Sequence, residues 1–263
     1  MSSYKNILTE ERDGVFILTF NRPEAKNAIS NEMYDEITDA MKYFEGNPSL
    51  ACAVITNVGN VFCAGQDLKE VARGEMEYAG DEDDWGFAAL TRHYFEKPII
   101  VAARGKIIGG GVEIVVASDL AVCADDSIFK LPEPRVGLTA AGGGTLLRLA
   151  REIPTKWALE LLLTAQAISA EKALSWGLVN YAVPDDEVLD KALYLAGEIA
   201  KGAPLSIKYS KRTVYETFGK GLIAPGDGWY VLDKYMNITH HSEDSIEGAK
   251  AFAEKRDPVW KGC

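Results

Sequence analysis

The sequence predicts an α/β fold in which helices cover most of the sheet surface. Short runs of aliphatic and β-branched residues recur along the chain, and glycine-rich turns and apolar helical segments follow them. Several of these runs are apolar throughout, which indicates strands buried on both faces. The chain has 263 residues, of which 47% are hydrophobic and 25% charged, and these values are ordinary for a large globular domain.

The first elements predict a hairpin, a helix and a buried strand. Residues 5–21 alternate around Asp13-Gly14, a dipeptide typical of tight turns between antiparallel strands. Ser30 is a candidate N-cap for a helix whose apolar residues follow at helical spacing, namely Tyr34, Ile37, Met41 and Phe44. Residues 51–55 then predict a buried strand that ends near Asn57.

The remaining elements continue this alternation and then become helical. Residues 99–103 and 120–124 predict strands, with a glycine-rich segment and an apolar helix at about 111–117 between them. Beyond Leu146 the predicted helices cover residues 155–164, 170–176, 186–202, 205–218 and 244–255. We therefore expect an α/β core over residues 1–200 and a helical C-terminal region over residues 201–263.

Composition excludes several classes of protein. The formal net charge of −11 argues against nucleic acid as the partner, because that binding depends on Lys and Arg neutralising phosphates. No apolar run approaches the ~20 residues that span a bilayer, and the N-terminus lacks a secretory signal pattern. The four cysteines form no metal-binding or disulfide spacing, so free thiols and a cytoplasmic location are expected, with no metal site.

Familiar catalytic motifs are missing from the sequence. There is no G-x-S-x-G motif, and none of the three histidines lies beside a nucleophile motif. Gly137 and Gly142 match the start of a phosphate-binding loop, but glycines stand where Lys and Ser/Thr are required. No G-x-G-x-x-G closes a first βα unit either, which argues against a dinucleotide site.

A glycine run and two glutamates are the distinctive features. Gly109-Gly110-Gly111 stands at a strand-to-helix junction, where glycine allows close approach and the first helical N–H groups lack partners. Glu113 follows in the first helical turn, although a helix-packing role for this segment is an equal alternative. Glu133 stands between two prolines, which predicts an extended, rigid segment.

A second glycine-containing turn, residues 61–68, follows the strand at 51–55. Two backbone N–H groups from separate segments that converge on one oxygen form an oxyanion hole, the device that stabilises a thioester enolate. Two glutamates facing one pocket would form a general acid/base pair. Spacing alone does not decide whether these segments meet.

At these residues the chain resembles the enoyl-CoA hydratase/isomerase (crotonase) superfamily. The resemblance runs from Arg22-Pro23-Glu24-Ala25-Lys26-Asn27-Ala28 to the C-terminus. Its motifs include Ala64-Gly65-Gln66-Asp67-Leu68, Gly109-Gly110-Gly111-Val112-Glu113 and residues 168–179. The closing segments, residues 242–248 and 252–262, look nearest to the carnitinyl-CoA dehydratase (crotonobetainyl-CoA hydratase) branch.

The resemblance implies a spiral of ββα units with a helical C-terminal trimerisation region, a homotrimer or homohexamer, and an acyl-CoA substrate. It implies that the amides of Ala64 and Gly110 hold the thioester oxygen, that Glu113 activates water, and that Glu133 exchanges a proton with substrate and water. It places substrate or coenzyme A contacts at Lys26, Ala28, Ala64, Gly65, Gln66, Asp67, Leu68, Gly110, Phe252 and Lys255. The last two residues often act from a neighbouring subunit in this family.

Both acidic positions are present, which favours an enoyl-CoA hydratase or 3-hydroxyacyl-CoA dehydratase that needs no cofactor beyond the coenzyme A of its substrate. An isomerase or another acyl-CoA reaction is the alternative within the family, and an RNA-binding relative is the alternative outside catalysis, which the acidic charge disfavours.

Two features depart from the family pattern or lie outside it. After Gly137-Leu138 the usual Pro-Asp or Pro-Gly is replaced by Thr139-Ala140-Ala141 and three further glycines, which makes the turn beside Glu133 less predictable. Residues 74–86 are rich in acidic side chains and predict a solvated loop. An alternative is that Asp83, Asp84 and Trp85 fold over the acyl pocket and favour a cationic acyl group.

Overall fold

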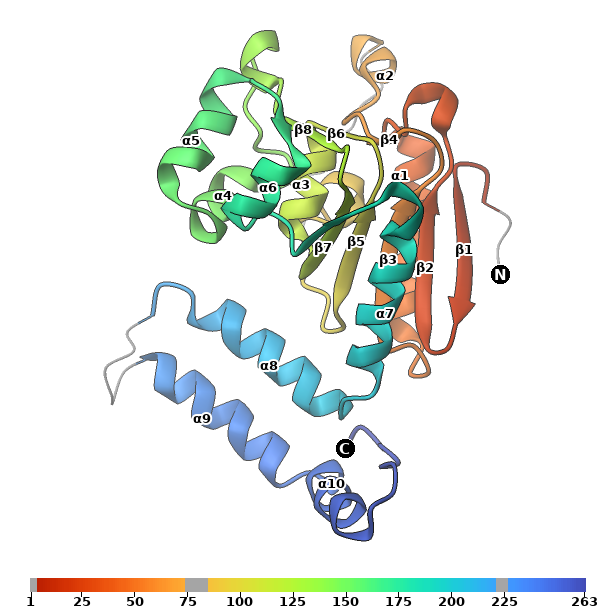
Figure 1. The fold of residues 1–263 in the computed structure, drawn as a ribbon, viewed down its shortest axis with the longest axis vertical. Coiled ribbons are helices and arrows are strands. Elements are labelled where there is room, and N and C mark those ends of the chain that lie inside the picture. The colour runs from red at the N-terminus through yellow and green to blue at the C-terminus, as the bar shows by residue number, and fades with distance from the viewer. Residues whose placement is uncertain (1–3, 74–84, 221–226) are drawn as a thin grey trace.

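The computed structural model describes residues 4–73, 85–220 and 227–263, which form two sheets with helices packed around them (Figure 1). The six-stranded sheet has the order β1-β2-β3-β5-β7-β10, and the four-stranded sheet has the order β4-β6-β8-β9. The strands are β1 (Ile7–Arg12), β2 (Val15–Phe20), β3 (Cys52–Asn57), β4 (Val61–Cys63), β5 (Ile99–Ala103), β6 (Lys106–Ile108), β7 (Leu120–Ala124), β8 (Ile128–Lys130), β9 (Ile168–Ser169) and β10 (Tyr181–Val183).

Successive strands alternate between the two sheets, which gives the chain a spiral path. β3 is followed by β4, β5 by β6, and β7 by β8, so each turn of the chain adds one parallel strand to the large sheet and one to the small sheet. The helix α3 (Gly110–Ala117) completes the second of these turns. The expected spiral of ββα units is therefore confirmed, and the Asp13-Gly14 turn joins the antiparallel strands β1 and β2 as predicted.

Both faces of the large sheet are buried, as the apolar strands predict. On one face, side chains such as Phe16, Ile55 and Val101 join the main core together with residues of α1 (Asn31–Gly46) and α3. On the other face, Val54 and Ile100 pack against α7 (Val188–Ala200). The sheet is thus enclosed between helices, and α3 enters the main core next to it.

The helices largely follow the sequence prediction. Ser30 caps α1 by accepting a hydrogen bond from the Met33 N–H at 3.2 Å. The other helices are α2 (Leu68–Ala72), α4 (Thr145–Glu152), α5 (Thr155–Thr164), α6 (Ala170–Trp176), α8 (Pro204–Thr217), α9 (Asp227–His240) and α10 (Glu243–Glu254). The sequence did not predict α2, α4 or α9, and the buried residues of α9 are only Gly228 and Tyr235. A helix without an apolar buried face gives little periodic signal.

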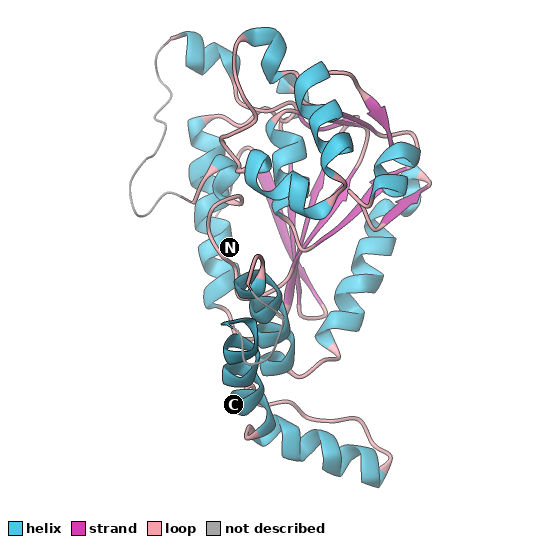
Figure 2. Cartoon of the chain, turned by 90° about the vertical axis from the view of Figure 1, so that its left-hand side faces the viewer, coloured by secondary structure: helices cyan, strands magenta, loops and turns pink. Residues whose placement is uncertain are grey.

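The C-terminal helices lie beside the α/β region rather than within it (Figures 1 and 2). α8 and α9 pack side by side, and α7, which covers the sheet, ends at Ala200 before α8 begins at Pro204. The division into a core of residues 1–200 and a C-terminal region of residues 201–263 remains a prediction.

Asp119, which precedes β7, connects the two regions. Its carboxylate accepts hydrogen bonds from Lys211 Nζ at 2.7 Å and from the Tyr215 hydroxyl at 3.1 Å, both on α8, and from the Ile99 N–H at 2.7 Å. A groove of about 520 Å³ lies beside this contact and is lined by residues of α3, α7 and α8. None of the described helices is long and apolar enough to cross a membrane.

Candidate functional site

The first two residues of α3, Gly110 and Gly111, are packed so closely that no side chain would fit there. A Cβ at Gly110 would lie 2.3 Å from two ring atoms of Phe87, and a Cβ at Gly111 would lie 2.6 Å from the Cys63 carbonyl oxygen. The Gly110 N–H is at the first helical position, where no intrahelical acceptor exists, and no acceptor within the described segments takes it. Close packing therefore presents a backbone donor at the positive end of a helix.

Glu113 is buried one turn into α3, with 5% of its surface exposed. Its Oε1 atom has no hydrogen-bond partner within the described part of the chain. Burial raises the pKa of its carboxyl group, and the N–H groups of Gly143 and Thr145 and the Arg148 charge oppose that rise. The carboxylate of Glu113 therefore faces the N-terminus of a second helix, α4, which favours its charged form.

The glycines that depart from the family pattern form the support of Glu113. A Cβ at Gly143 would lie 2.5 Å from Glu113 Cβ, and a Cβ at Gly142 would lie 3.5 Å from Glu113 Oε2. Glycine at position 143 lets the backbone before α4 approach the carboxylate directly. The backbone at Gly142 and Gly143 is therefore in close contact with Glu113.

Glu133 reaches the same helix end from a different segment. A Cβ at Gly109 would lie 3.0 Å from Glu133 Oε1, so the carboxyl group lies beside the glycine run. Burial raises the pKa of Glu133, and the nearby charge of Glu113 raises it further. The Oε2 atom is buried and has no hydrogen-bond partner among the described residues. The structure therefore brings Glu113, Glu133 and the Gly110 amide together.

The backbone at Glu133 differs from the extended conformation that the flanking prolines predict. Glu133 begins a short 3₁₀ helix, η3 (Glu133–Val136), and Pro132 before it has φ −79° and ψ −6°. The prediction of an extended segment was therefore wrong. Prolines fit the first positions of a helical turn because the N–H groups there lack intrahelical acceptors.

Glycine is also required where the loop of residues 61–68 meets α3. Gly65 has φ +90°, and a Cβ there would lie 3.4 Å from the Gly110 nitrogen, so this loop lies against the proposed donor. The Ala64 N–H, however, donates to the Lys26 carbonyl at 3.1 Å, and the Gly65 N–H donates to the Cys63 sulfur at 3.3 Å. Ala64 as an amide donor to substrate is therefore a poor assignment, because its N–H is already engaged.

The N–H of Gln66 points in a different direction from the N–H of Ala64. In its parallel bridge with Ile29, the Gly65 carbonyl and the Asp67 N–H make the two hydrogen bonds to Ile29, each at 2.9 Å. The N–H of the residue between them therefore points away from Ile29. Sequence comparison alone did not distinguish Gln66 from Ala64, because the direction of each N–H depends on contacts with residues 26–29.

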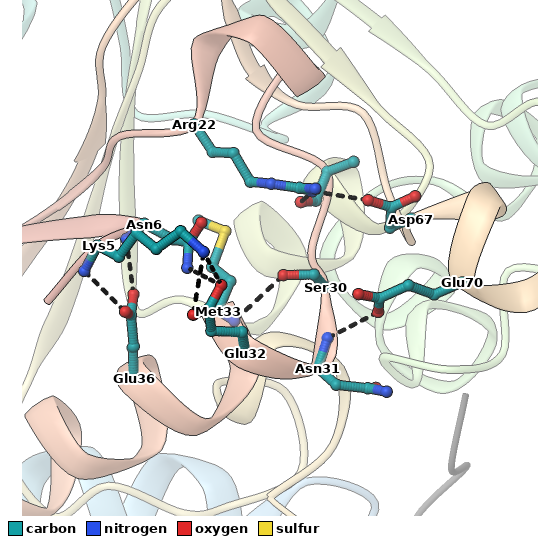
Figure 3. A network of polar contacts seen from close by, with 11 residues as sticks. Lys5, Asn6, Arg22, Ser30, Asn31, Glu32, Met33, Glu36, Asp67 and Glu70 are labelled. Atoms are coloured by element: carbon teal, nitrogen blue, oxygen red, sulfur yellow. Dashed lines mark hydrogen bonds and ion pairs between the residues drawn. The ribbon is translucent and has the colours of Figure 1, made fainter. Parts of the chain in front are cut away.

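A polar network holds this loop in place (Figure 3). Asp67 accepts hydrogen bonds from Arg22 at 2.7 Å and from the Lys69 N–H at 3.0 Å, and Arg22 also donates to the Ala28 carbonyl at 2.9 Å. The buried Asp67 carboxylate thus caps α2 and ties the loop to residues 22–28. In this structure the Asp67 carboxylate positions the loop, and its predicted place on the coenzyme path stays a prediction.

The other predicted coenzyme contacts fall into two groups. Lys26 is exposed and Ala28 half-buried on the segment that adjoins the loop of residues 61–68, and Leu68, the last residue of this loop, is exposed. Phe252 lies in α10 and Lys255 directly follows it, and Figures 1 and 2 show α10 remote from α3. Within one chain the structure does not bring these last two residues to the glutamates.

Sequence reasoning missed a third segment of the site. Asp83 and Asp84 of the acidic stretch lie outside the described residues, but Trp85 begins a turn that reaches α3 and carries Phe87 and the fully buried Thr91. Thr145, at the start of α4, was also missed. Among the described residues neither the Thr91 nor the Thr145 hydroxyl oxygen has a hydrogen-bond partner. Neither residue belongs to a recognisable motif, so only the structure identifies them.

Comparison with known proteins agrees with this geometry. A family model described as Enoyl-CoA hydratase/isomerase matches residues 10–263. The chain is 41% identical over 250 residues to the carnitinyl-CoA dehydratase of Escherichia coli (strain K12), covering 93% of this chain and 94% of that protein.

Solved structures give the same result. An enoyl-CoA hydratase from Mycobacterium marinum is similar with a TM-score of 0.91 and 39% identity over 98% of this chain and 99% of that one. A carnitinyl-CoA hydratase from Mycobacterium avium has a TM-score of 0.76 and 39% identity, with 99% of this chain and 100% of that one covered. The chain belongs to the enoyl-CoA hydratase/isomerase family of enzymes.

Proposed function

We propose that the protein adds water across the α,β-double bond of an enoyl-CoA thioester, or removes it from the 3-hydroxyacyl-CoA. The observation that carries this proposal is the meeting of Glu113 and Glu133 at the N-terminus of α3, beside a backbone N–H with no acceptor among the described residues. A hydration needs one carboxylate, one carboxylic acid and a donor for the thioester oxygen.

The positions of the two glutamates suggest how they divide the roles. Burial raises the pKa of both carboxyl groups; backbone N–H groups of Gly143 and Thr145 oppose the rise at Glu113, and a backbone hydrogen bond opposes it at Glu133, where the nearby charge of Glu113 adds to it. Because Glu113 faces the N-terminus of α4, which favours a charged carboxylate, we assign it as the group that takes a proton from water and Glu133 as the acid.

The proposed reaction follows from these positions. The thioester oxygen accepts hydrogen bonds from the Gly110 and Gln66 amides, which stabilise the enolate by about 3–4 kcal/mol per donor. Glu113 removes a proton from water as the hydroxyl adds to the β-carbon, and Glu133 donates its proton to the α-carbon. Hydration causes no net oxidation or reduction, so we expect no redox cofactor.

Mass spectrometry of water gain and loss tests the proposal across enoyl- and 3-hydroxyacyl-CoA thioesters. We expect Glu113→Gln and Glu133→Gln each to lower kcat by about 10²–10⁴-fold, because each removes a group that transfers a proton. Glu152→Gln is the matched control, because this glutamate is exposed and lies at the opposite end of α4 from Thr145. Unchanged turnover in both site variants would reject the assignment.

For the acyl group we propose a crotonobetainyl or carnitinyl thioester. The support is the name of the 41% identical relatives, carnitinyl-CoA dehydratase, together with the similar closing segments. Crotonobetainyl-CoA should then be hydrated faster than crotonyl-CoA in the same panel. Equal kcat/KM values for the two thioesters would count against it.

For assembly we propose a homotrimer, alone or paired as a hexamer, in the cytoplasm. Exposed aromatic and aliphatic side chains on α9, such as Trp229, Tyr230 and Met236, support an interface there. Phe252 and Lys255 are remote from the site of their own chain, so they would contact a coenzyme A nucleotide bound to a neighbouring subunit. Light scattering of the purified protein measures the number of chains directly.

A further inference from the structure

The turn from Trp85 to Arg92 is held in a strained conformation against α3. Ala88 and Ala89 both have positive φ, at 55° and 52°, a conformation that costs a non-glycine residue about 1–3 kcal/mol. The Arg92 N–H closes the turn by donating to the Trp85 carbonyl at 3.0 Å. Gly86 admits no side chain, because a Cβ there would lie 2.6 Å from the Thr91 hydroxyl oxygen.

Aromatic packing fixes both ends of this turn to α1. The Trp85 ring stacks on His93 with centroids 3.9 Å apart, and the Phe95 ring meets Trp85 edge-on at 5.6 Å. His93 Nε2 contacts Glu45 Oε2 at 2.9 Å, and Lys42 lies 5.7 Å from the centre of the Trp85 ring. Strain of this kind persists only where the surroundings enforce it, and it is concentrated at functional sites.

The turn contacts the site at two points. Phe87 covers Gly110, since two of its ring atoms lie 2.3 Å from the position of a Cβ there. Cα–Cβ bonds tilt toward the N-terminus of a helix, so the ring lies alongside the N-terminal amides. At the other contact, the Thr91 methyl carbon lies 3.1 Å from the Cβ position of Gly143, and that position lies 2.5 Å from Glu113 Cβ.

These two contacts orient the turn relative to the acyl group. In the proposed reaction, on which this inference rests, the thioester oxygen is at Gly110 and the β-carbon is at the water held by Glu113. The turn contacts Gly110 through Phe87 and reaches the base of the Glu113 side chain through Thr91 and Gly143. In the proposed reaction the turn would therefore lie along the acyl chain and not along the coenzyme, with its aromatic ring at the carbonyl end, next to the α-carbon.

We infer that Phe87 is the specificity-determining residue for substituents on the α-carbon, because its ring closes the pocket beside the Gly110 amide. Thioesters with hydrogen at this carbon fit, whereas α-methyl thioesters meet the ring. Thr91 and the buried alanines hold the ring in place. The α-proton that Glu133 delivers then comes from the side of Gly109, whose Cβ position lies 3.0 Å from Glu133 Oε1.

The test compares kcat/KM for crotonyl-CoA and 2-methylcrotonyl-CoA in wild type and in Phe87→Ala. We expect wild type to prefer crotonyl-CoA, and Phe87→Ala to lower that preference by at least about 10-fold, the usual effect of one methyl group in a fitted pocket. Phe87→Leu should give an intermediate ratio and serves if the alanine variant folds poorly.

Phe95→Leu is the control, because Phe95 is buried behind the turn and contacts Trp85 and His93. It should lower stability and leave the substrate ratio within about 2-fold, since it removes no atom from the pocket. A substrate ratio that is unchanged in folded Phe87→Ala and Phe87→Leu would overturn the inference.

Failure of the proposed reaction is distinguishable from failure of this inference. If wild type hydrates no thioester, calorimetric binding of butyryl-CoA and 2-methylbutyryl-CoA replaces the kinetic ratio. A preference for butyryl-CoA that Phe87→Ala removes supports the role of Phe87 even so. Equal binding of both thioesters by wild type overturns it.

Discussion

Helices α3 and α8 show how differently two regions of this molecule are held. Of the eight residues of α3, seven are buried, whereas none of the fourteen residues of α8 is. α3 is fixed by close packing on all sides, which positions its first N–H groups and Glu113. α8 is attached through Asp119 and through Glu96, which pairs with Lys208 and Arg212. Tight side-chain packing is therefore concentrated at the proposed active site.

In the proposed assembly, a neighbouring subunit would bury the side chains of α8 that are exposed in one chain. Val214, Tyr215 and Phe218 are exposed along its C-terminal half, and the groove of about 520 Å³ beside Asp119 separates it from α3 and α7. Polar pairs give such a contact its orientation but contribute less free energy than apolar burial does.

A pair of phenylalanine substitutions gives the largest contrast between the regions. Phe44 is fully buried on α1 and stacks on Phe16 with centroids 5.7 Å apart, whereas Phe218 is 50% exposed. We expect Phe44→Ala to lower the free energy of unfolding by about 3–5 kcal/mol, because it leaves a cavity in the core. Phe218→Ala should cost about 0.5 kcal/mol or less in the dilute chain.

Urea denaturation measures both variants. A decrease of more than about 2 kcal/mol in the free energy of unfolding for Phe218→Ala would contradict this expected difference between α1 and α8. It would show that the assembled protein buries the Phe218 ring.

The next contrast concerns the connection between the regions. Asp119→Asn removes the charge that Lys211 faces, and the Lys211 side chain is only 11% exposed. We expect a loss of about 1.5–3 kcal/mol, the value of a hydrogen bond to a charged group. Hydrogen exchange should accelerate in α8 and stay slow in α3.

Glu96→Gln is the control for this contrast, because its pairs with Lys208 and Arg212 are more exposed and should contribute about 1 kcal/mol or less. Equal acceleration of exchange in α3 and α8 would show that the two regions unfold together.

The smallest expected effect is a gain in stability. Burial raises the pKa of Glu113 above its ordinary value of 4.5, so the folded protein binds this proton more tightly than the unfolded chain does. Stability from this group is complete below the ordinary pKa and is lost as the pH rises through the raised value. Glu113→Gln should therefore stabilise the protein at neutral pH by about 0.5–2 kcal/mol while it lowers kcat by about 10²–10⁴-fold.

Thermal unfolding from pH 4 to pH 8 measures this effect, with Glu152→Gln for comparison. The gain from Glu113→Gln should grow as the pH rises. A gain that is the same at every pH would contradict the burial of a charged carboxylate.

The proposed site shows how far sequence reasoning reaches. The glycine run, Glu113 and Glu133 were predicted because each stands in a local motif, and the structure brings them together. Three further features were not predicted. They are the engagement of the Ala64 amide, the 3₁₀ turn at Glu133 and the contact of Phe87 with Gly110. Each depends on a second segment that is remote in the sequence.

By itself, the sequence determined the α/β class, the hairpin at Asp13-Gly14, the helix capped by Ser30 and the family. These are properties of local pattern, where spacing and turn chemistry act within a few residues. Only the tertiary structure showed that the Ala64 N–H is engaged, that Glu113 lies against the backbone before α4 and that Phe87 packs on Gly110. The reason is physical, because N–H direction, burial and charge–charge distance are set by neighbours that the chain brings together only when it folds.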